Sequence, residues 1–290
     1  MKSLQVLVVT HKLFDDSIIR DGYKVIKVGR NVSDEEAEKH NYLLDNVGDN
    51  ISSENPYYCE LTAQYWAWKN LDESVAYYIG INHYRRYFFD YRLKSKEFKN
   101  DIISKDRIIS ILEKKKAIMS FPTVKYAGYG TLYKNKPDTE QDKHWVIIRD
   151  IIKKDYPELV DSFEKVLYGR FTTWGNMVIT TKDIFDNYSA WIFEILKKYD
   201  KELEERGERR IPRVDGFLSE YLLLVWFHKH LKRREIKYLE VRNTETDSFV
   251  DYTDSIKGRI IKLLRSNYIT LYISRYIRIG YLLIKRRNKH

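Results

Sequence analysis

The chain has little cysteine, since Cys59 is the only one among its 290 residues. A single thiol excludes an internal disulfide framework, and it cannot form a cysteine-based zinc site by itself. We expect Cys59 to be a small core residue, because free cysteines are among the most buried residue types.

The sequence also gives no sign of a secretory leader. Met1-Lys2-Ser3 runs directly into a strand-like stretch, without an apolar segment that ends in small residues. The sequence therefore predicts a protein that stays in the cytoplasm.

Acidic residues are absent from residues 255–290, which contain ten lysines and arginines. Without those ten, the 52 basic residues of the chain fall to 42, which equals the number of acidic residues. The body is thus neutral and carries no recognised nucleic-acid motif, which argues against a nucleic-acid-binding protein. That class stays an alternative because the sequence pI is near 9.3.

The basic C-terminal segment predicts a helix that lies on a membrane. Residues 256–264 place four apolar side chains at the spacing of one helical face. Residues 268–284 are more apolar but contain two arginines. They lack the roughly 20 uncharged residues that a spanning helix needs. We predict that residues 251–290 form a basic amphipathic helical tail on an anionic membrane surface. The alternatives are packing on the domain or pairing with another subunit.

Apolar runs of strand length alternate with segments of helical periodicity along residues 1–250, which we predict to be one domain. This alternation predicts an α/β fold with a mostly parallel central sheet covered on both faces. The expected strands are residues 4–9, 23–28, 75–81, 117–121, 175–180 and 236–241. The expected helices are residues 57–70, 107–115, 142–152, 158–167, 182–206 and 214–230.

The strand expected at residues 75–81 gives way abruptly to His83, Tyr84, Arg85 and Arg86. Ligands of open α/β sheets bind beyond the carboxyl ends of the strands. Two adjacent arginines at such an edge suit a diphosphate, because guanidinium groups bind phosphate oxygens through charge-assisted hydrogen bonds. The alternative is that they are surface charges beside a strand.

Two further segments carry candidate donor-binding residues. Thr10, His11 and Lys12 follow the first expected strand, where a nucleotide would enter, and the alternative is that the histidine and lysine are simple loop residues. Asp49 and Asn50 lie in a turn-rich loop, and their side chains either accept hydrogen bonds from a ribose or a base or simply form the turn.

Four segments together resemble the exopolysaccharide-biosynthesis family catalogued as domain of unknown function 4422. They are residues 8–12, 48–52, 58–70 and 80–88, and the His-Tyr-Arg-Arg-Tyr block at 83–87 is the most specific. The resemblance extends over residues 4–241. Members look like glycosyltransferases that use nucleotide-diphospho-sugars, some of them linked to galactofuranose transfer in capsule or O-antigen synthesis. The resemblance implies a Rossmann-like glycosyltransferase domain of the A type.

Many enzymes of that type hold the donor diphosphate through a metal bound by an Asp-x-Asp motif, and this sequence contains none. His83-Tyr84-Arg85-Arg86 stands where the motif would be expected. Cationic side chains can stabilise the charge of a departing diphosphate as a metal would. We therefore expect a reaction that needs no divalent metal.

Inverting glycosyl transfer needs a base for the acceptor hydroxyl, and a carboxylate is the usual choice. Asp215 and Glu220 are the best candidates, at the start of the helix expected at residues 214–230. Their alternatives are a helix cap for Asp215 and a solvent residue for Glu220. Glu60 is a third acidic candidate with no separate support.

Flat aromatic faces with polar edges suit carbohydrates. Trp66, Tyr129 and Trp174 are therefore candidate acceptor-binding residues, and the alternative is that aromatic residues at helical spacing belong to the core.

The leading hypothesis is an inverting glycosyltransferase that uses a UDP-sugar and a lipid-linked polysaccharide acceptor at the inner face of the plasma membrane. UDP-galactofuranose is the first candidate donor, from the resemblance alone. The alternatives are a retaining transferase of the same fold, a non-catalytic scaffold for polysaccharide assembly, and a basic nucleic-acid-binding protein.

Overall fold

The structure is a computed structural model that describes residues 2–90, 101–121, 123–124, 140–169, 171–173 and 175–245. The predicted tail at residues 251–290 and the candidate residues Tyr129 and Trp174 lie outside the described residues.

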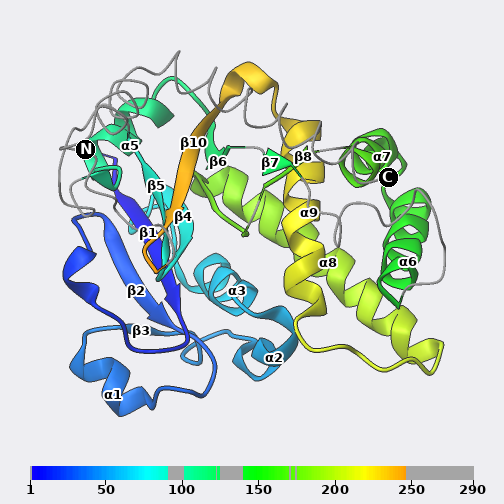
Figure 1. Ribbon diagram of the computed structural model, residues 1–290, viewed down its shortest axis with the longest axis horizontal. Helices are drawn as coiled ribbons and strands as arrows, with labels where there is room; N and C mark the ends of the chain where they lie inside the picture. Colours follow the sequence, from blue (N-terminus) through cyan, green and yellow to red (C-terminus); the bar gives the residue numbers. More distant parts are fainter. Residues whose placement is uncertain are drawn as a thin grey trace, which may run out of the picture.

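Eight strands form one sheet, in the order β3-β2-β1-β4-β5-β10-β6-β9 (Figure 1). A further pairing joins β4 to β9, so that β4, β5, β10, β6 and β9 close into a ring. Two short strands, β7 and β8, pair separately. The strands are β1 (Leu4–Thr10), β2 (Tyr23–Lys27), β3 (Leu43–Leu44), β4 (Tyr78–His83), β5 (Arg86–Phe89), β6 (Ala117–Ser120), β7 (Thr123–Val124), β8 (Phe171–Thr172), β9 (Val178–Thr181) and β10 (Ile236–Asn243).

The α/β class is confirmed, but the prediction of a mostly parallel sheet is wrong. The pairs β1–β2, β1–β4, β2–β3 and β6–β10 are parallel. The pairs β4–β5, β5–β10, β4–β9 and β6–β9 are antiparallel. The physical reason lies partly in β5, which follows β4 through the two-residue turn Tyr84–Arg85, and a turn this short can only join antiparallel strands.

Alternate residues of the central strands enter two different cores. On β1, Val6 and Val8 pack into the cluster that includes helix α5 (Lys105–Leu112). Leu7 and Val9 pack into the cluster that includes helix α3 (Leu61–Asn70). This is the period of two that a strand covered on both faces requires.

A group of long helices packs beside β6 and β9. The outer helices are α6 (Glu140–Asp155) and α7 (Val160–Tyr168), and the inner ones are α8 (Lys182–Glu205) and α9 (Val214–His230) (Figure 1). Residues 221–227 of α9 are all buried, as expected for a helix that is apolar on every side. The other helical elements are α1 (Asp34–Lys39), α2 (Asn55–Tyr58), η1 (Asp16–Ile18), η2 (Ser52–Glu54), η3 (Pro157–Leu159) and η4 (Arg233–Glu235).

The helix expected at residues 57–70 is broken in two. Cys59 has a φ of 51°, in a region that favours glycine, and it separates α2 from α3. It is also not the core residue that we expected, since it is only partly buried.

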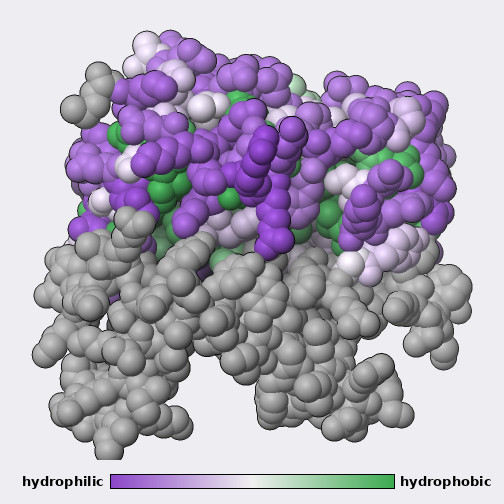
Figure 2. Space-filling model, turned by 90° about the horizontal axis from the view of Figure 1, so that it is seen from above, coloured by the Kyte–Doolittle hydropathy of each residue, from purple (hydrophilic) through white to green (hydrophobic). Residues whose placement is uncertain are grey.

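The described surface is largely hydrophilic on the side seen in Figure 2. Among the described residues, no helix is both long enough and apolar enough to cross a membrane.

Candidate active site

A cavity of about 610 Å³ lies beyond the carboxyl ends of β1, β2 and β4. Its far wall comes from α2, the turn after α2 and the first turns of α9. This is where the sheet geometry predicts a ligand site. The lining residues are Val9, Thr10, His11, Val28, Gly29, Arg30, Asn31, Asn55, Pro56, Cys59, Glu60, His83, Tyr84, Arg85, Arg86, Arg213, Gly216, Phe217 and Glu220.

The hairpin between β4 and β5 places two arginines at this cavity. Arg85 lies in the turn, and Arg86 is the first residue of β5, opposite His83. Arg85 forms an ion pair of 3.1 Å with Glu245, which also pairs with Lys12 at 2.9 Å. Glu245 thereby holds the end of β10 against the rim of the cavity.

Arg86 has no ion-pair partner among the residues that the structure describes. A Cβ atom at Gly175 would lie 3.6 Å from Arg86 Nη1 and 3.1 Å from His83 Nε2. Gly175 therefore makes room for the His83 side chain, and its φ of 73° is a second reason for glycine at this position.

Both histidines of the cavity favour the neutral form. Burial lowers the pKa of His83, and the nearby charge of Arg86 opposes protonation further, although Glu60 favours it. Partial burial also lowers the pKa of His11, with Lys12 and Arg85 acting in the same direction. The positive charge of the cavity therefore comes from arginine rather than histidine.

Two glutamates at the cavity are held by consecutive residues before β9. The Gly175 N–H donates to Glu220 Oε1 at 3.0 Å. The Asn176 side chain donates to Glu60 Oε1 at 2.8 Å and to Ser219 Oγ at 2.8 Å. The segment at 175–176 thus fixes both carboxylates and ties them to α9.

Burial raises the pKa of Glu220 to about 7, and the negative charge of Glu60 adds to the effect. The Gly175 N–H and the charge of Arg86 act in the opposite direction by favouring the carboxylate. Glu220 can therefore accept or release a proton near neutral pH, which is the property that general acid–base catalysis requires.

The structure brings about half of the candidate residues together at the cavity. Those that line the cavity are Thr10, His11, His83, Tyr84, Arg85, Arg86 and Glu220. Lys12 lies at the rim, with its Nζ 5.0 Å from the centre of the Tyr84 ring. These residues come from the ends of β1 and β4 and from α9, as the sequence predicted.

Asp215 is placed behind the cavity wall instead. Its side chain is fully buried, and Oδ2 accepts a hydrogen bond of 2.8 Å from Arg210. The start of α9 therefore presents Gly216 to the cavity, and the Asp215 carboxylate turns away from it.

Asp49, Asn50 and Trp66 do not line the cavity. Asn50 donates to the backbone of Gly48, and Asp49 accepts from Tyr65, so both stabilise their own loop. Trp66 is 9% exposed and donates its ring N–H to the carbonyl of Val47. For these three residues the structure agrees with the alternatives of a turn and a core aromatic.

Sequence reasoning missed two residues of the site, Asn176 and Arg213. Glu60 was named as a third acidic candidate, but nothing in the sequence supported it separately. Glu60 lies just after the break between α2 and α3. The helical periodicity of this segment gives no indication of that break. Arg213 directly precedes α9. The sequence feature that could have pointed to it is an arginine placed between Pro212 and an expected helix.

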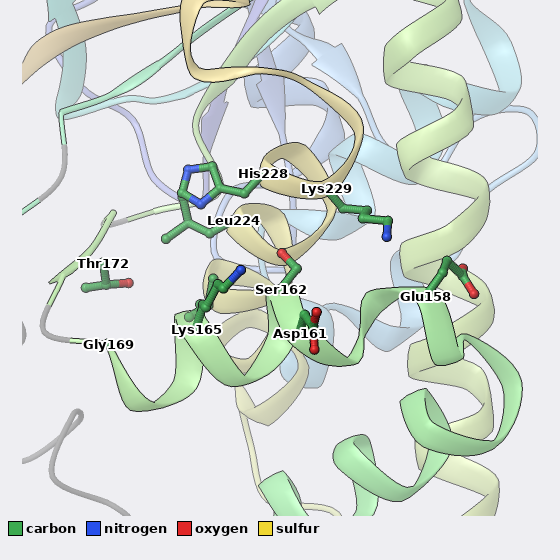
Figure 3. A pocket seen from close by; sticks show the side chains of 10 residues that line it. Glu158, Asp161, Ser162, Lys165, Gly169, Thr172, Leu224, His228 and Lys229 are labelled. Carbon is green, nitrogen blue, oxygen red and sulfur yellow. The ribbon is translucent and has the colours of Figure 1, made fainter.

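A second, smaller cavity of about 390 Å³ lies between α7 and α9 (Figure 3). Lys165 and Asp161 reach it from α7, and His228 and Lys229 reach it from α9. None of the candidate residues lines it, so the first cavity is the candidate active site.

Among the described residues, no group of three or more histidine, cysteine, aspartate or glutamate side chains is arranged to hold a metal ion.

The chain is similar to a protein family and to a solved glycosyltransferase structure. A family model described as Domain of unknown function (DUF4422) matches residues 5–232. The apo structure of WbbM, a bifunctional glycosyltransferase, is similar with a TM-score of 0.64 and 25% identity, over 83% of this chain and 45% of WbbM. The chain thus spans less than half the length of WbbM. The mannosyltransferase Ktr4p from S. cerevisiae gives a TM-score of 0.40 and 11% identity, over 94% of this chain and 82% of Ktr4p. No curated protein matches the sequence.

Proposed function

We propose that this chain, which belongs to the family described as Domain of unknown function (DUF4422), is a glycosyltransferase with a Rossmann-like fold of the A type. Its donor is a nucleotide-diphospho-sugar, for which a UDP-sugar, and UDP-galactofuranose among them, is the first candidate. The similarity to a bifunctional glycosyltransferase supports the class of reaction. The observation that carries the proposal is the meeting of two arginines with a glutamate of raised pKa in one cavity.

The donor fits the cavity in one direction. The part formed by the ends of β1 and β2 offers Val9, Val28 and Asn31 to a nucleoside, and it also contains the charged side chain of Arg30. Arg85 and Arg86 then meet the diphosphate, because guanidinium groups match phosphate oxygens in geometry and charge. The sugar reaches Glu220 beyond them.

Glu220 is the proposed general base. Its carboxylate removes the proton of the acceptor hydroxyl, and the hydroxyl oxygen forms a bond to the anomeric carbon. The bond from that carbon to the diphosphate breaks, and the nucleoside diphosphate leaves with both electrons. A single displacement of this kind inverts the anomeric configuration.

The charge on the leaving diphosphate is met by Arg85 and Arg86 rather than by a metal. Fixed cations in a partly enclosed cavity stabilise developing charge without reorganising. We therefore propose that the transfer needs no divalent metal.

The acceptor is a lipid-linked polysaccharide at the inner face of the plasma membrane. The tail at residues 251–290 would bind the anionic surface of that membrane through its ten basic residues. Tyr129 and Trp174 stay proposed acceptor-binding residues. Trp66 is no longer proposed, because it is packed and its ring N–H is already bonded.

The test is a screen of UDP-, GDP- and TDP-sugars for thermal stabilisation, followed by transfer assays with each stabilising donor. A donor at 100 times its Kd adds about 2.7 kcal/mol to stability. Proton NMR of the product's anomeric centre separates inversion from retention. A chain that binds no nucleotide sugar is not a glycosyltransferase, and binding without transfer to any acceptor indicates a scaffold.

A further inference from the structure

Arg213 occupies a backbone position that favours glycine. Residues 211–214 form a β-turn in which the Val214 N–H donates to the Ile211 carbonyl at 3.2 Å. Pro212 is the second residue of the turn, and Arg213, the third, has φ 66° and ψ 7°. A turn with proline second and a positive φ third normally has glycine or asparagine there. An arginine in this conformation is strained, and such strain concentrates at functional sites.

The side chain of Arg213 lines the candidate active site. Its guanidinium lies 5.1 Å from the centre of the Phe217 ring, which also lines the cavity. Among the described residues it has no ion-pair partner, whereas Arg85 is paired with Glu245. The left-handed turn therefore delivers a positive charge to the cavity, where it acts on the Cys59 thiol and on Glu220.

The residue that anchors this turn is Arg210. Its guanidinium contacts three carboxylates, with distances of 2.7 Å to Glu54, 3.0 Å to Asp200 and 2.8 Å to Asp215. It also stacks over the Tyr57 ring at 4.0 Å from the centroid. One arginine thus ties the segment before α9 to α8 and to the start of α2.

The backbone of Arg213 is also fixed directly, by a contact with α2. Its backbone N–H donates to the Pro56 carbonyl at 2.9 Å, and Pro56 lines the cavity. Arg210 and the Pro56 contact therefore hold Arg213 between them. Because Arg210 does not line the cavity, its effect on a ligand would pass through the residues that it positions.

We propose that Arg213 is a third guanidinium that binds the leaving diphosphate, and that Arg210 is the positioning residue that holds it at the cavity. This rests on the proposed function. Arg213 approaches from the start of α9, whereas Arg85 and Arg86 come from the β4–β5 hairpin, so the bound diphosphate joins two separate elements of the fold. This explains why an arginine stands where the turn favours glycine.

The sharpest test replaces Arg213 by glycine. Arg213→Gly removes the guanidinium and suits the left-handed backbone, so the fold is kept and Tm does not fall. Calorimetry with UDP, and with GDP in parallel, should show a Kd at least about tenfold higher than wild type, the effect of losing one charge-assisted contact. The Kd for uridine or guanosine should be unchanged, because neither carries a phosphate. Arg209→Ala, an exposed neighbour, is the matched control.

The outcomes separate the two proposals. Wild-type protein that binds neither diphosphate overturns the proposed function along with this assignment. Wild-type binding that Arg213→Gly leaves unchanged overturns the role of Arg213 alone. An equal loss of nucleoside and nucleoside diphosphate binding also overturns it, because the residue would then be shaping the cavity.

A double-mutant cycle tests Arg210. Arg210→Ala should weaken UDP binding in the wild-type background but add little in the Arg213→Gly background, because both changes remove the same contact. Additive losses overturn the positioning role. If Arg210→Ala does not fold, Arg210→Lys keeps the charge but loses the three-way contact, and the same cycle is measured with it.

Discussion

The carboxylate of Glu220 accepts a hydrogen bond from the backbone N–H of Gly175, with 3.0 Å between Oε1 and the nitrogen. This bond favours the ionised form of Glu220, whereas burial and the charge of Glu60 favour the protonated form. The balance leaves the pKa of Glu220 at about 7. Gly175 therefore does more than give His83 room, since its N–H also directs the proposed base.

Glu220→Gln should abolish transfer while keeping nucleotide binding, because the amide cannot take a proton. In the wild type, activity should rise with pH through a midpoint near 7 as Glu220 ionises. A pH profile of kcat and a Kd for UDP check both points, with the exposed Glu73→Gln as control. Retained turnover in Glu220→Gln would exclude Glu220 as the base.

The same group affects stability. An unfolded glutamate titrates near about 4.3, and Glu220 in the fold titrates near 7. Between these values the native protein holds a proton that the unfolded chain has lost, so stability falls as pH rises through this window. Glu220→Gln should therefore melt higher than wild type at pH 8 but not at pH 4, as measured by thermal unfolding.

Arg85→Ala and Arg86→Ala should each lower turnover at least about a hundredfold, the scale for loss of a preorganised charge contact. Steady-state kinetics at saturating donor measure the effect. Arg209→Ala should be as active as wild type. Full activity in both cavity variants would mean that these arginines are surface charges.

Transfer should survive excess chelator, because arginines rather than a metal meet the charge on the leaving group. The assay measures the transfer rate without EDTA, with excess EDTA, and after manganese or magnesium is added back. Activity that is lost on chelation and restored by either ion would reveal a metal site.

Arg210→Ala should lower the free energy of unfolding by about 3–5 kcal/mol at pH 8, the cost of leaving buried charges without a partner. The loss should be smaller at pH 5. Burial raises the pKa of Asp200 to about 7 and of Asp215 to about 6, so both carboxylates are largely protonated there. Urea unfolding at the two pH values measures the difference, and an equal loss at both would contradict it.

Truncation after Asp254 should leave a folded domain that still binds donor, but it should abolish binding to anionic liposomes. The truncated chain should transfer to a short soluble acceptor and poorly to a lipid-linked one. Co-sedimentation with anionic and neutral liposomes, with a salt titration, checks the electrostatic part, which is screened within about 8 Å at physiological ionic strength. Equal binding to both kinds of liposome would contradict it.

Much of the fold could be read from the sequence because the strands and helices carry clear apolar patterns. Leu4–Thr10 and Val214–His230 were expected nearly to the residue. Strand direction could not be read. Residues 86–89 form β5, but the arginines and the tight turn that precede them conceal an antiparallel hairpin.

The site could be predicted where it follows directly from a strand end. Thr10, His11 and the residues at 83–86 were found in this way. Arg213 could not, and Glu60 was only a third acidic candidate, because they reach the cavity through left-handed backbone at Arg213 itself and at Cys59. A positive φ at a residue other than glycine leaves no mark in hydrophobic periodicity.

The strand ring has a consequence for biosynthesis. Among the strands that the structure describes, β10 leaves the ribosome last, yet it lies between β5 and β6. Until β10 emerges, β5 and β6 each expose an edge with unpaired N–H and C=O groups. Such edges can pair with strands of other chains. Glu245, the partner of Lys12 and Arg85, arrives later still. We therefore expect stalled or shortened products that end before residue 236 to aggregate.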